Sequence, residues 1–223
     1  MKKKNNWIVV TDFDGTLTQK DVGNELCRIY AEEKYSQLQK LYKEKKLSLR
    51  AYQKQMWENF PLTKSQFMEE SARLGSLRKG VNEFLERCLR LEVPVYIASC
   101  GIDTYIQSVI QGHLSESSRA AILETKSNKA LYTEDGQFLE IECPEKSDHP
   151  NALPLHKGKW AQKLAEKHDG AKTMCLGNGN SDKSFIGHCD LLFATEKFAT
   201  HCENEKIEHI YFDDFRKLYQ FNF

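Results

Sequence analysis

The feature that most constrains the fold is a series of short apolar runs separated by helical patterns. Between the runs, apolar residues recur at helical spacing, as they do from Val81 to Leu89. Alternating strands and helices predict a Rossmann-like, doubly wound parallel sheet with helices on both faces, an α/β fold. Such sheets bind ligands at the carboxyl ends of their strands. The runs that we interpret as strands are 7–11, 93–98, 173–176, 190–194 and, less clearly, 207–212.

Two insertions interrupt this alternation. Residues 19–75 are rich in Lys, Glu, Gln and aromatic residues, and Thr63 to Gln66 matches the capping box of a last helix. We therefore predict a small helical cap domain at 19–75, inserted into a core domain of residues 1–18 and 76–223. The second insertion, roughly 120–144, predicts a β-hairpin that turns at Asp135-Gly136, followed by a loop over 144–154.

Composition and charge argue against several classes of function. Lys+Arg and Asp+Glu both total 32, so no net charge favours binding to nucleic acid or to an anionic membrane. No apolar stretch is long enough for a membrane span, and the basic residues 2–4 are followed too soon by Thr11 and Asp12 for an export signal. Seven scattered cysteines without a C-x-x-C pair fit reduced thiols, so we expect a soluble, cytoplasmic protein.

The sharpest chemical signal is Asp12-Phe13-Asp14-Gly15-Thr16, directly after the first predicted strand. Two unpaired carboxylates would be costly to bury there, and a divalent cation would resolve that conflict. Oxygen ligands suit Mg²⁺, and one carboxylate could then attack phosphorus while the other exchanges protons with the leaving oxygen. Gly15 permits a sharp turn that presents backbone N–H groups to an anion. A calcium loop fails on spacing, because its glycine would fall at Leu17; a plain strand-end turn remains the alternative for this motif alone.

Matching chemistry follows the other predicted strands. The hydroxyl and backbone N–H groups of Ser99-Cys100-Gly101 could hold phosphate at a helix start, although a serine there is usually an N-cap. Lys157 opens a later helix and could neutralise a carboxylate and a phosphate, with Lys159 as its rival. The stretch 177–182, Gly-Asn-Gly-Asn-Ser-Asp, could complete a magnesium shell or form an ordinary Asn-Gly turn. Each signal is modest alone, and their order along the chain makes them strong.

In that order these motifs resemble the haloacid dehalogenase superfamily of phosphatases, and the resemblance covers nearly the whole chain. It implies that Asp12 is the nucleophile, and that Asp14 is the general acid/base and gives its backbone carbonyl to Mg²⁺. It implies that Lys157 stabilises the phosphoryl charge. The remaining roles that we assign are phosphate binding by Ser99, Cys100 and Gly101 and metal binding by Asp12, Asp14, Asn178 and Asp182. We interpret the thiol of Cys100 as structural rather than nucleophilic, because the sequence shows no histidine partner for it.

The helical insertion is similar to the cap of the phosphoserine phosphatase branch. The overall layout is most similar to the methionine-salvage 2-hydroxy-3-keto-5-methylthiopentenyl-1-phosphate phosphatases. One position departs from the family pattern, which has aspartate where this chain has Asn178. An amide oxygen supplies no negative charge, so we expect weaker magnesium affinity than aspartate would give, with Asp182 as a compensating charge.

The predicted function is magnesium-dependent hydrolysis of a phosphomonoester through an aspartyl-phosphate on Asp12. A phosphotransferase or mutase would use the same nucleophile but another acceptor. A non-catalytic phosphate-binding module is a further alternative, supported only by Asn178. A small phosphorylated metabolite is the default partner; a phosphotyrosine phosphatase acting on a phosphopeptide or phosphoprotein is the alternative if the cap leaves the site open.

Overall fold

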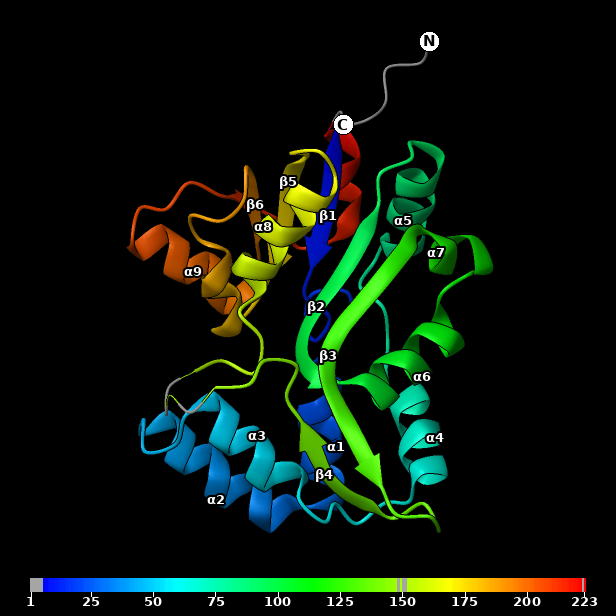
Figure 1. Cartoon of the computed structure of the whole chain (residues 1–223), viewed down its shortest axis with the longest axis vertical. Coiled ribbons are helices and arrows are strands. Elements are labelled where there is room, and N and C mark those ends of the chain that lie inside the picture. The colour runs from blue at the N-terminus through cyan, green and yellow to red at the C-terminus, as the bar shows by residue number, and fades with distance from the viewer. Residues whose placement is uncertain (1–5, 148, 150–151, 222) are drawn as a thin grey trace.

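A seven-stranded sheet forms the centre of the molecule, in the order β4-β3-β2-β1-β5-β6-β7 (Figure 1). The computed structural model describes residues 6–147, 149, 152–221 and 223. Neighbouring strands pair in parallel except β3 and β4, which are antiparallel. The α/β fold predicted from the apolar runs is therefore confirmed. The strands are β1 Trp7–Thr11, β2 Val95–Ile102, β3 Ile122–Tyr132, β4 Phe138–Glu142, β5 Lys172–Gly177, β6 Leu191–Ala194 and β7 Ile210–Tyr211.

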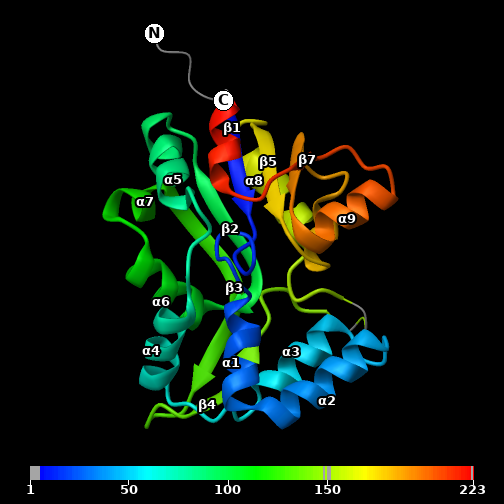
Figure 2. The same ribbon diagram turned by 180° about the vertical axis from the view of Figure 1, so that it is seen from behind.

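Helices cover both faces of the sheet. Successive residues of a strand point to opposite faces, and both faces carry apolar side chains that the helices bury. Val9 of β1 packs into a core shared with α5 (Val81–Arg90) and α6 (Asp103–His113). Its neighbours Ile8 and Val10 pack into a second core, shared with α8 (Lys157–Lys167) and α9 (Glu196–Asn204). Figure 2 shows the two layers from behind. The remaining elements of this part are α7 Glu116–Ala121 and the short 3₁₀ helices η1 Ser181–Phe185 and η2 Phe215–Gln220.

Four helices occupy the predicted insertion at 19–75, at the end of the molecule away from the C-terminus (Figure 1). The chain enters and leaves this insertion side by side, because Thr18 and Leu77 form an antiparallel bridge. Both halves of the expected capping box form, since Thr63 and Gln66 satisfy each other's backbone N–H groups at the start of α4. The four helices are α1 Val22–Tyr30, α2 Glu32–Lys43, α3 Leu49–Trp57 and α4 Lys64–Leu74.

The predicted hairpin is β3–β4, and its turn contains Gly136 at a φ of 84°. The hairpin also reaches the helical insertion, which the sequence pattern does not predict. The backbone N–H of Asn59 donates to the carbonyl of Leu139 at 2.8 Å, and the rings of Trp57 and Phe138 stack at 6.1 Å. Of the loop expected over 144–154, residues 148, 150 and 151 lie outside the described part of the chain, as do residues 1–5.

Strand β2 is longer than its apolar run suggests. It continues through Ser99 to Ile102, and α6 begins only at Asp103. The register with β3 shifts between Ala98 and Ile102, so the intervening residues bulge out of the regular ladder. Ser99 therefore lies on a strand bulge and not at the helix start that the sequence suggests.

All seven cysteines are free thiols. Within the described residues, no helix combines the length and apolar character needed to cross a bilayer.

Candidate active site

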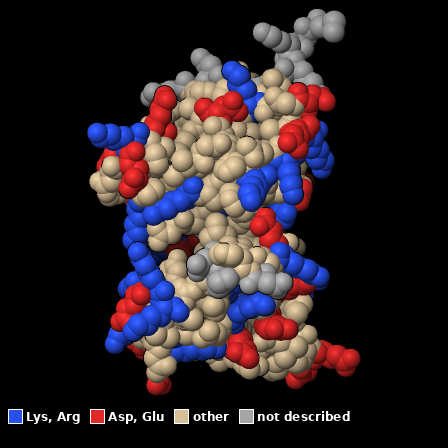
Figure 3. All heavy atoms as spheres, turned by 60° about the vertical axis from the view of Figure 1, so that its left-hand side comes forward, with Lys and Arg blue, Asp and Glu red and all other residues tan. Residues whose placement is uncertain are grey.

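A pocket of about 300 Å³ lies where the carboxyl ends of β1, β2 and β5 meet the helical insertion. Strand β1 has β2 on one side and β5 on the other, so connections leave it in opposite directions and open a crevice at the strand ends. Figure 3 shows a hollow at mid-height with acidic atoms inside it. The lining includes Asp12, Asp14, Ser99 and Asn178. Residues from three predicted motifs therefore share one cavity.

The fourth motif lies directly behind the pocket wall, where Lys157 is completely buried. Its Nζ is 2.6 Å from Oδ1 of Asp12 and 2.6 Å from Oδ1 of Asp182. Burial alone would lower the pKa of Lys157, but these two carboxylates raise it above its ordinary value, so the side chain stays an ammonium. Lys159, the rival residue, is exposed. The structure thus brings Lys157, and not Lys159, to Asp12.

The environment of Asp12 makes its negative charge less favourable than that of an exposed aspartate. Burial and the carboxylate of Asp182 raise the pKa of Asp12 to about 7, against the opposing effect of Lys157. A positive charge next to the pocket would lower that pKa again. The site is therefore electrostatically suited to receive a cation.

Asp14 is held by two hydrogen bonds from different parts of the chain. Its Oδ1 accepts from the backbone N–H of Val22 at 2.9 Å, and its Oδ2 accepts from the hydroxyl of Tyr105 on α6. Burial raises the pKa of Asp14 well above its ordinary value, and the carboxylate of Asp21 adds to that shift. The protonated form of Asp14 is therefore more accessible than that of an exposed aspartate. Sequence reasoning missed Tyr105, because its helical spacing indicates only a core aromatic.

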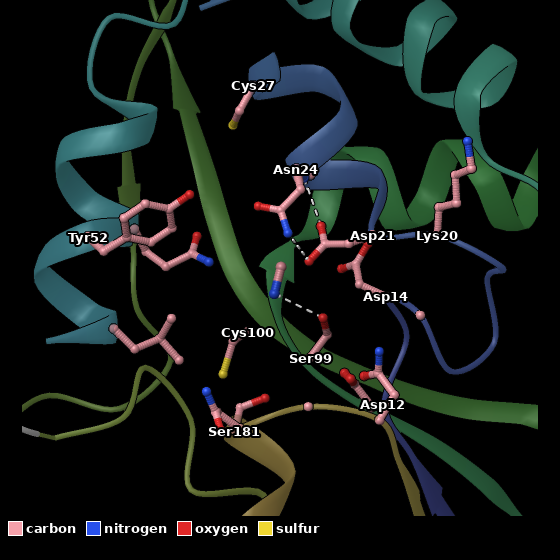
Figure 4. A pocket seen from close by; sticks show the side chains of 18 of the residues that line it. Asp12, Asp14, Lys20, Asp21, Asn24, Cys27, Tyr52, Ser99, Cys100 and Ser181 are labelled. Carbon is pink, nitrogen blue, oxygen red and sulfur yellow. Dashed lines mark hydrogen bonds between the residues drawn. The ribbon is translucent and has the colours of Figure 1, made fainter. Parts of the chain in front are cut away.

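The bulge of β2 supplies the next wall of the pocket. Figure 4 shows Ser99 beside Asp12 and the thiol of Cys100 turned toward the cavity. The backbone N–H of Gly101, which the sequence offers to phosphate, donates instead to Oγ of Ser99 at 2.9 Å. Burial raises the pKa of Cys100 to about 11, which disfavours the thiolate and agrees with a structural thiol.

Both carboxylate oxygens of Asp182 are engaged by groups of the protein. Its Oδ2 accepts from the backbone N–H groups of Asn178 and Gly179 at 2.9 and 2.8 Å, and its Oδ1 accepts from Lys157. The residue is completely buried. The geometry therefore favours a supporting role, in which Asp182 shapes the loop after β5 and holds Lys157, over the metal-binding role expected from the sequence.

The remaining oxygen donors are of the chemical type that Mg²⁺ prefers. The amide of Asn178 lies against the loop of the acidic pair, so closely that a Cβ on Gly15 would be 2.0 Å from its Nδ2. Its Oδ1 accepts a long hydrogen bond of 3.4 Å from Thr16. The carboxylate of Asp12, the backbone carbonyl of Asp14 and the amide oxygen of Asn178 are hard donors, which Mg²⁺ prefers and thiophilic metals do not.

The wall formed by the helical insertion is mostly uncharged. Nε2 of Gln39 donates to the hydroxyl of Tyr52 at 3.1 Å and to Oδ1 of Asn24 at 3.4 Å. Figure 4 shows Tyr52 and Asn24 facing the cavity, whereas the ammonium of Lys20 points away from it. The other uncharged side chains on this wall are Gln19, Cys27, Tyr42, Leu49, Gln53, Met56 and Trp57.

Comparison with protein families and curated proteins gives a consistent result. The family model described as haloacid dehalogenase-like hydrolase matches residues 9–186, well over half of the chain. A protein of Microcystis aeruginosa named 2-hydroxy-3-keto-5-methylthiopentenyl-1-phosphate phosphatase is 25% identical over 214 residues, which cover 96% of each chain. A protein of the same name from Bacillus mycoides (strain KBAB4) is 23% identical, over 94% of this chain and 93% of the relative.

Solved structures share the fold along the whole chain. A substrate-bound phosphoserine phosphatase complex superposes with a TM-score of 0.72 at 18% identity, covering 98% of this chain and 99% of that one. A HAD family hydrolase from Salmonella enterica serovar Typhi superposes with a TM-score of 0.74 at 18% identity, covering 95% of this chain and 68% of that one. At these identities the likeness concerns the fold.

Proposed function

The chain belongs to the haloacid dehalogenase-like hydrolase family, and on that premise we propose that it hydrolyses a phosphomonoester through an aspartyl-phosphate on Asp12, with Mg²⁺ as cofactor. Its curated relatives are named as phosphatases. The observation that carries the proposal is the contact between Asp12 and the buried ammonium of Lys157, at the edge of a pocket that also contains Asp14.

In the first step, Oδ of Asp12 attacks phosphorus and the ester P–O bond breaks. Protonated Asp14 gives its proton to the departing alcohol oxygen, which its raised pKa supports. Lys157 stays charged and stabilises the negative charge that gathers near Asp12. The Ser99 hydroxyl is the proposed partner of the phosphoryl oxygens.

In the second step, Asp14 acts in the opposite sense and accepts a proton from water. The water oxygen attacks phosphorus, the acyl–phosphate bond breaks, and Asp12 returns as a carboxylate. Val22 and Tyr105 keep the Asp14 carboxyl group at one position through both steps.

Asp12, the backbone carbonyl of Asp14 and Asn178 would hold the magnesium ion. When bound, the ion supplies positive charge that offsets repulsion between a carboxylate and a phosphate.

The uncharged wall of the insertion supports a small substrate with a neutral body. Among the described residues that line the pocket, positions 24–57 offer amides, phenols, a thiol, a thioether and apolar groups but no cation. The lysines of the lining, Lys20 and Lys197, lie outside this stretch, and the ammonium of Lys20 points away from the cavity (Figure 4). We propose 2-hydroxy-3-keto-5-methylthiopentenyl-1-phosphate, the compound in the names of the curated relatives, as the substrate to test first. Its body carries hydroxyl, keto and thioether groups and no charge.

A phosphate-release assay with Mg²⁺ and no added acceptor tests the proposal. We expect release from this compound, slower release from phosphoserine and from a phosphotyrosyl peptide, and none from any of them with Asp12→Asn. Release that requires an added alcohol would indicate a phosphotransferase. Faster turnover of the peptide would contradict the substrate assignment, and substantial activity in Asp12→Asn would contradict the mechanism.

A further inference from the structure

A carboxylate that no sequence motif singles out contacts Asn178. Nδ2 of Asn178 donates to Oε2 of Glu196 at 3.1 Å, and Glu196 is the first residue of α9 and lines the pocket. An ionised carboxylate only accepts hydrogen bonds, so the amide atom that faces Glu196 must be the NH₂ group. The amide oxygen is then turned away from Glu196, and it accepts from Thr16.

Glu196 is itself fixed by an arginine. The guanidinium of Arg78 donates to Oε1 of Glu196 at 2.8 Å, which leaves Oε2 for Asn178. Arg78 also donates to the backbone carbonyls of Gly15 and Thr16, in the loop of the acidic pair. The side chain of Arg78 is 12% exposed, whereas that of Glu196 is 46% exposed. One nearly buried arginine therefore ties Glu196 to the loop that contains Asp14.

The backbone at Glu196 is also unusual. Its φ is 51°, in the left-handed region that a side chain larger than that of asparagine seldom adopts. A residue held in this region carries backbone strain that the surrounding structure must offset. The fold keeps this conformation at the residue of α9 whose side chain bonds to the amide group of Asn178.

We propose that Glu196 is a positioning residue for the metal site: it holds Asn178 so that its amide oxygen, and not its NH₂ group, is presented to the cation. This inference rests on the magnesium site of the proposed function, and it concerns how that site is built.

The arrangement changes what is expected of the Asn178→Asp variant. From the sequence alone, a carboxylate at 178 should tighten metal binding. In the structure it would face the carboxylate of Glu196, and two acceptors at hydrogen-bond distance repel each other. Asp at 178 should therefore tighten binding only when residue 196 can donate, as glutamine can.

Titration of the apo protein with Mn²⁺, followed by the electron paramagnetic resonance signal of the free ion, tests the proposal without turnover. We expect Glu196→Gln to weaken Mn²⁺ binding about tenfold, the lower end of such effects. We expect the double variant Asn178→Asp/Glu196→Gln to bind more tightly than either single variant. Glu203→Gln, at an exposed position of the same helix, should bind as the parent does.

The outcomes separate the two proposals. A parent protein that binds no Mn²⁺ would overturn the metal site itself, and with it the role of Glu196. A parent that binds, with a Glu196→Gln variant of equal affinity, would overturn only the role of Glu196. The role of Glu196 would also be overturned if Mn²⁺ affinity falls in Glu196→Gln and the double variant does not restore it. A melting temperature of Glu196→Gln that falls in parallel with its Mn²⁺ affinity would likewise overturn that role, because it would show that the substitution disturbs α9 as a whole.

Discussion

At the scale of single residues, Lys157 is the side chain on which the site depends most. It is fully buried and lies 2.6 Å from each of two carboxylates. Removing one partner from such a group leaves buried charge without compensation, which costs about 3–5 kcal/mol. We expect Lys157→Ala to lower the free energy of unfolding by that amount in urea denaturation at neutral pH, and to abolish turnover.

Lys159→Ala is the matched control, since Lys159 is exposed on the same helix two residues further on. We expect its unfolding free energy to stay within about 0.5 kcal/mol of the parent value. Equal stability of Lys157→Ala and Lys159→Ala would contradict the buried charge network.

Tyr105 should control the pH dependence of the reaction through Asp14. Its hydrogen bond favours the ionised carboxylate and so lowers the pKa of Asp14, against burial, which raises it. In Tyr105→Phe that pKa should rise further. Because protonated Asp14 is the acid, activity is lost as pH rises through this pKa, and the alkaline limb of kcat/KM should move to higher pH.

Phosphate-release rates across pH, for the parent and Tyr105→Phe, measure this shift. Tyr96→Phe is the control, because Tyr96 is also a buried tyrosine but bonds to His168 and not to Asp14. An alkaline limb that stays in place or moves to lower pH in Tyr105→Phe would show that the hydroxyl does not tune Asp14.

Some residues of the site could be predicted from the sequence and others could not. Asp12, Asp14 and Lys157 could be predicted to lie together because each follows or begins a regular element at one edge of a parallel sheet. Tyr105 and Glu196 could not, because a tyrosine at core spacing and a glutamate in a first helical turn are ordinary. Only the contacts with Asp14 and Asn178 distinguish them.

At the scale of elements, the loop after β1 depends on a glycine for two separate reasons. Gly15 has a φ of 71°, and a Cβ there would be 2.0 Å from Nδ2 of Asn178. Gly15→Ala should therefore both strain the backbone and displace the amide. We expect weaker Mn²⁺ binding and a loss of stability of at least about 1 kcal/mol.

Gly136→Ala separates these two causes. Gly136 has a φ of 84° with nothing within 4 Å of the added Cβ, so it shares the strain but not the collision. We expect thermal melting to show a loss in both variants, and Mn²⁺ titration to show a loss only in Gly15→Ala. Equal Mn²⁺ affinity in both variants would mean that the position of the Asn178 amide does not depend on the absence of a Cβ at Gly15.

The boundaries of a strand can be predicted from the sequence where its apolar run ends abruptly. Strand β1 coincides with the predicted 7–11, because Asp12 follows directly. Strand β2 was predicted to end at 98 but continues to Ile102, because the small and polar residues 99–101 carry no strand pattern and join the sheet through a bulge.

At the scale of the whole molecule, the hairpin β3–β4 packs against the helical insertion, which forms one wall of the pocket. The insertion could be predicted from its length and helical pattern, and the hairpin from its turn. The contact between the insertion and the hairpin could not be predicted. Trp57 and Phe138 are distant in sequence, and each has the pattern of an ordinary core aromatic residue. The boundary of a separate cap domain at 19–75 stays a prediction.

The most direct test of the account is to trap the covalent intermediate. Turnover of a phosphoryl-labelled substrate with Mg²⁺, stopped in acid and followed by peptide mapping, should place the label on the peptide that contains Asp12. The same experiment with Asp12→Asn should give no labelled peptide. Label on Ser99 or Cys100, or rapid phosphate release by Asp12→Asn, would contradict the central claim that Asp12 is the nucleophile.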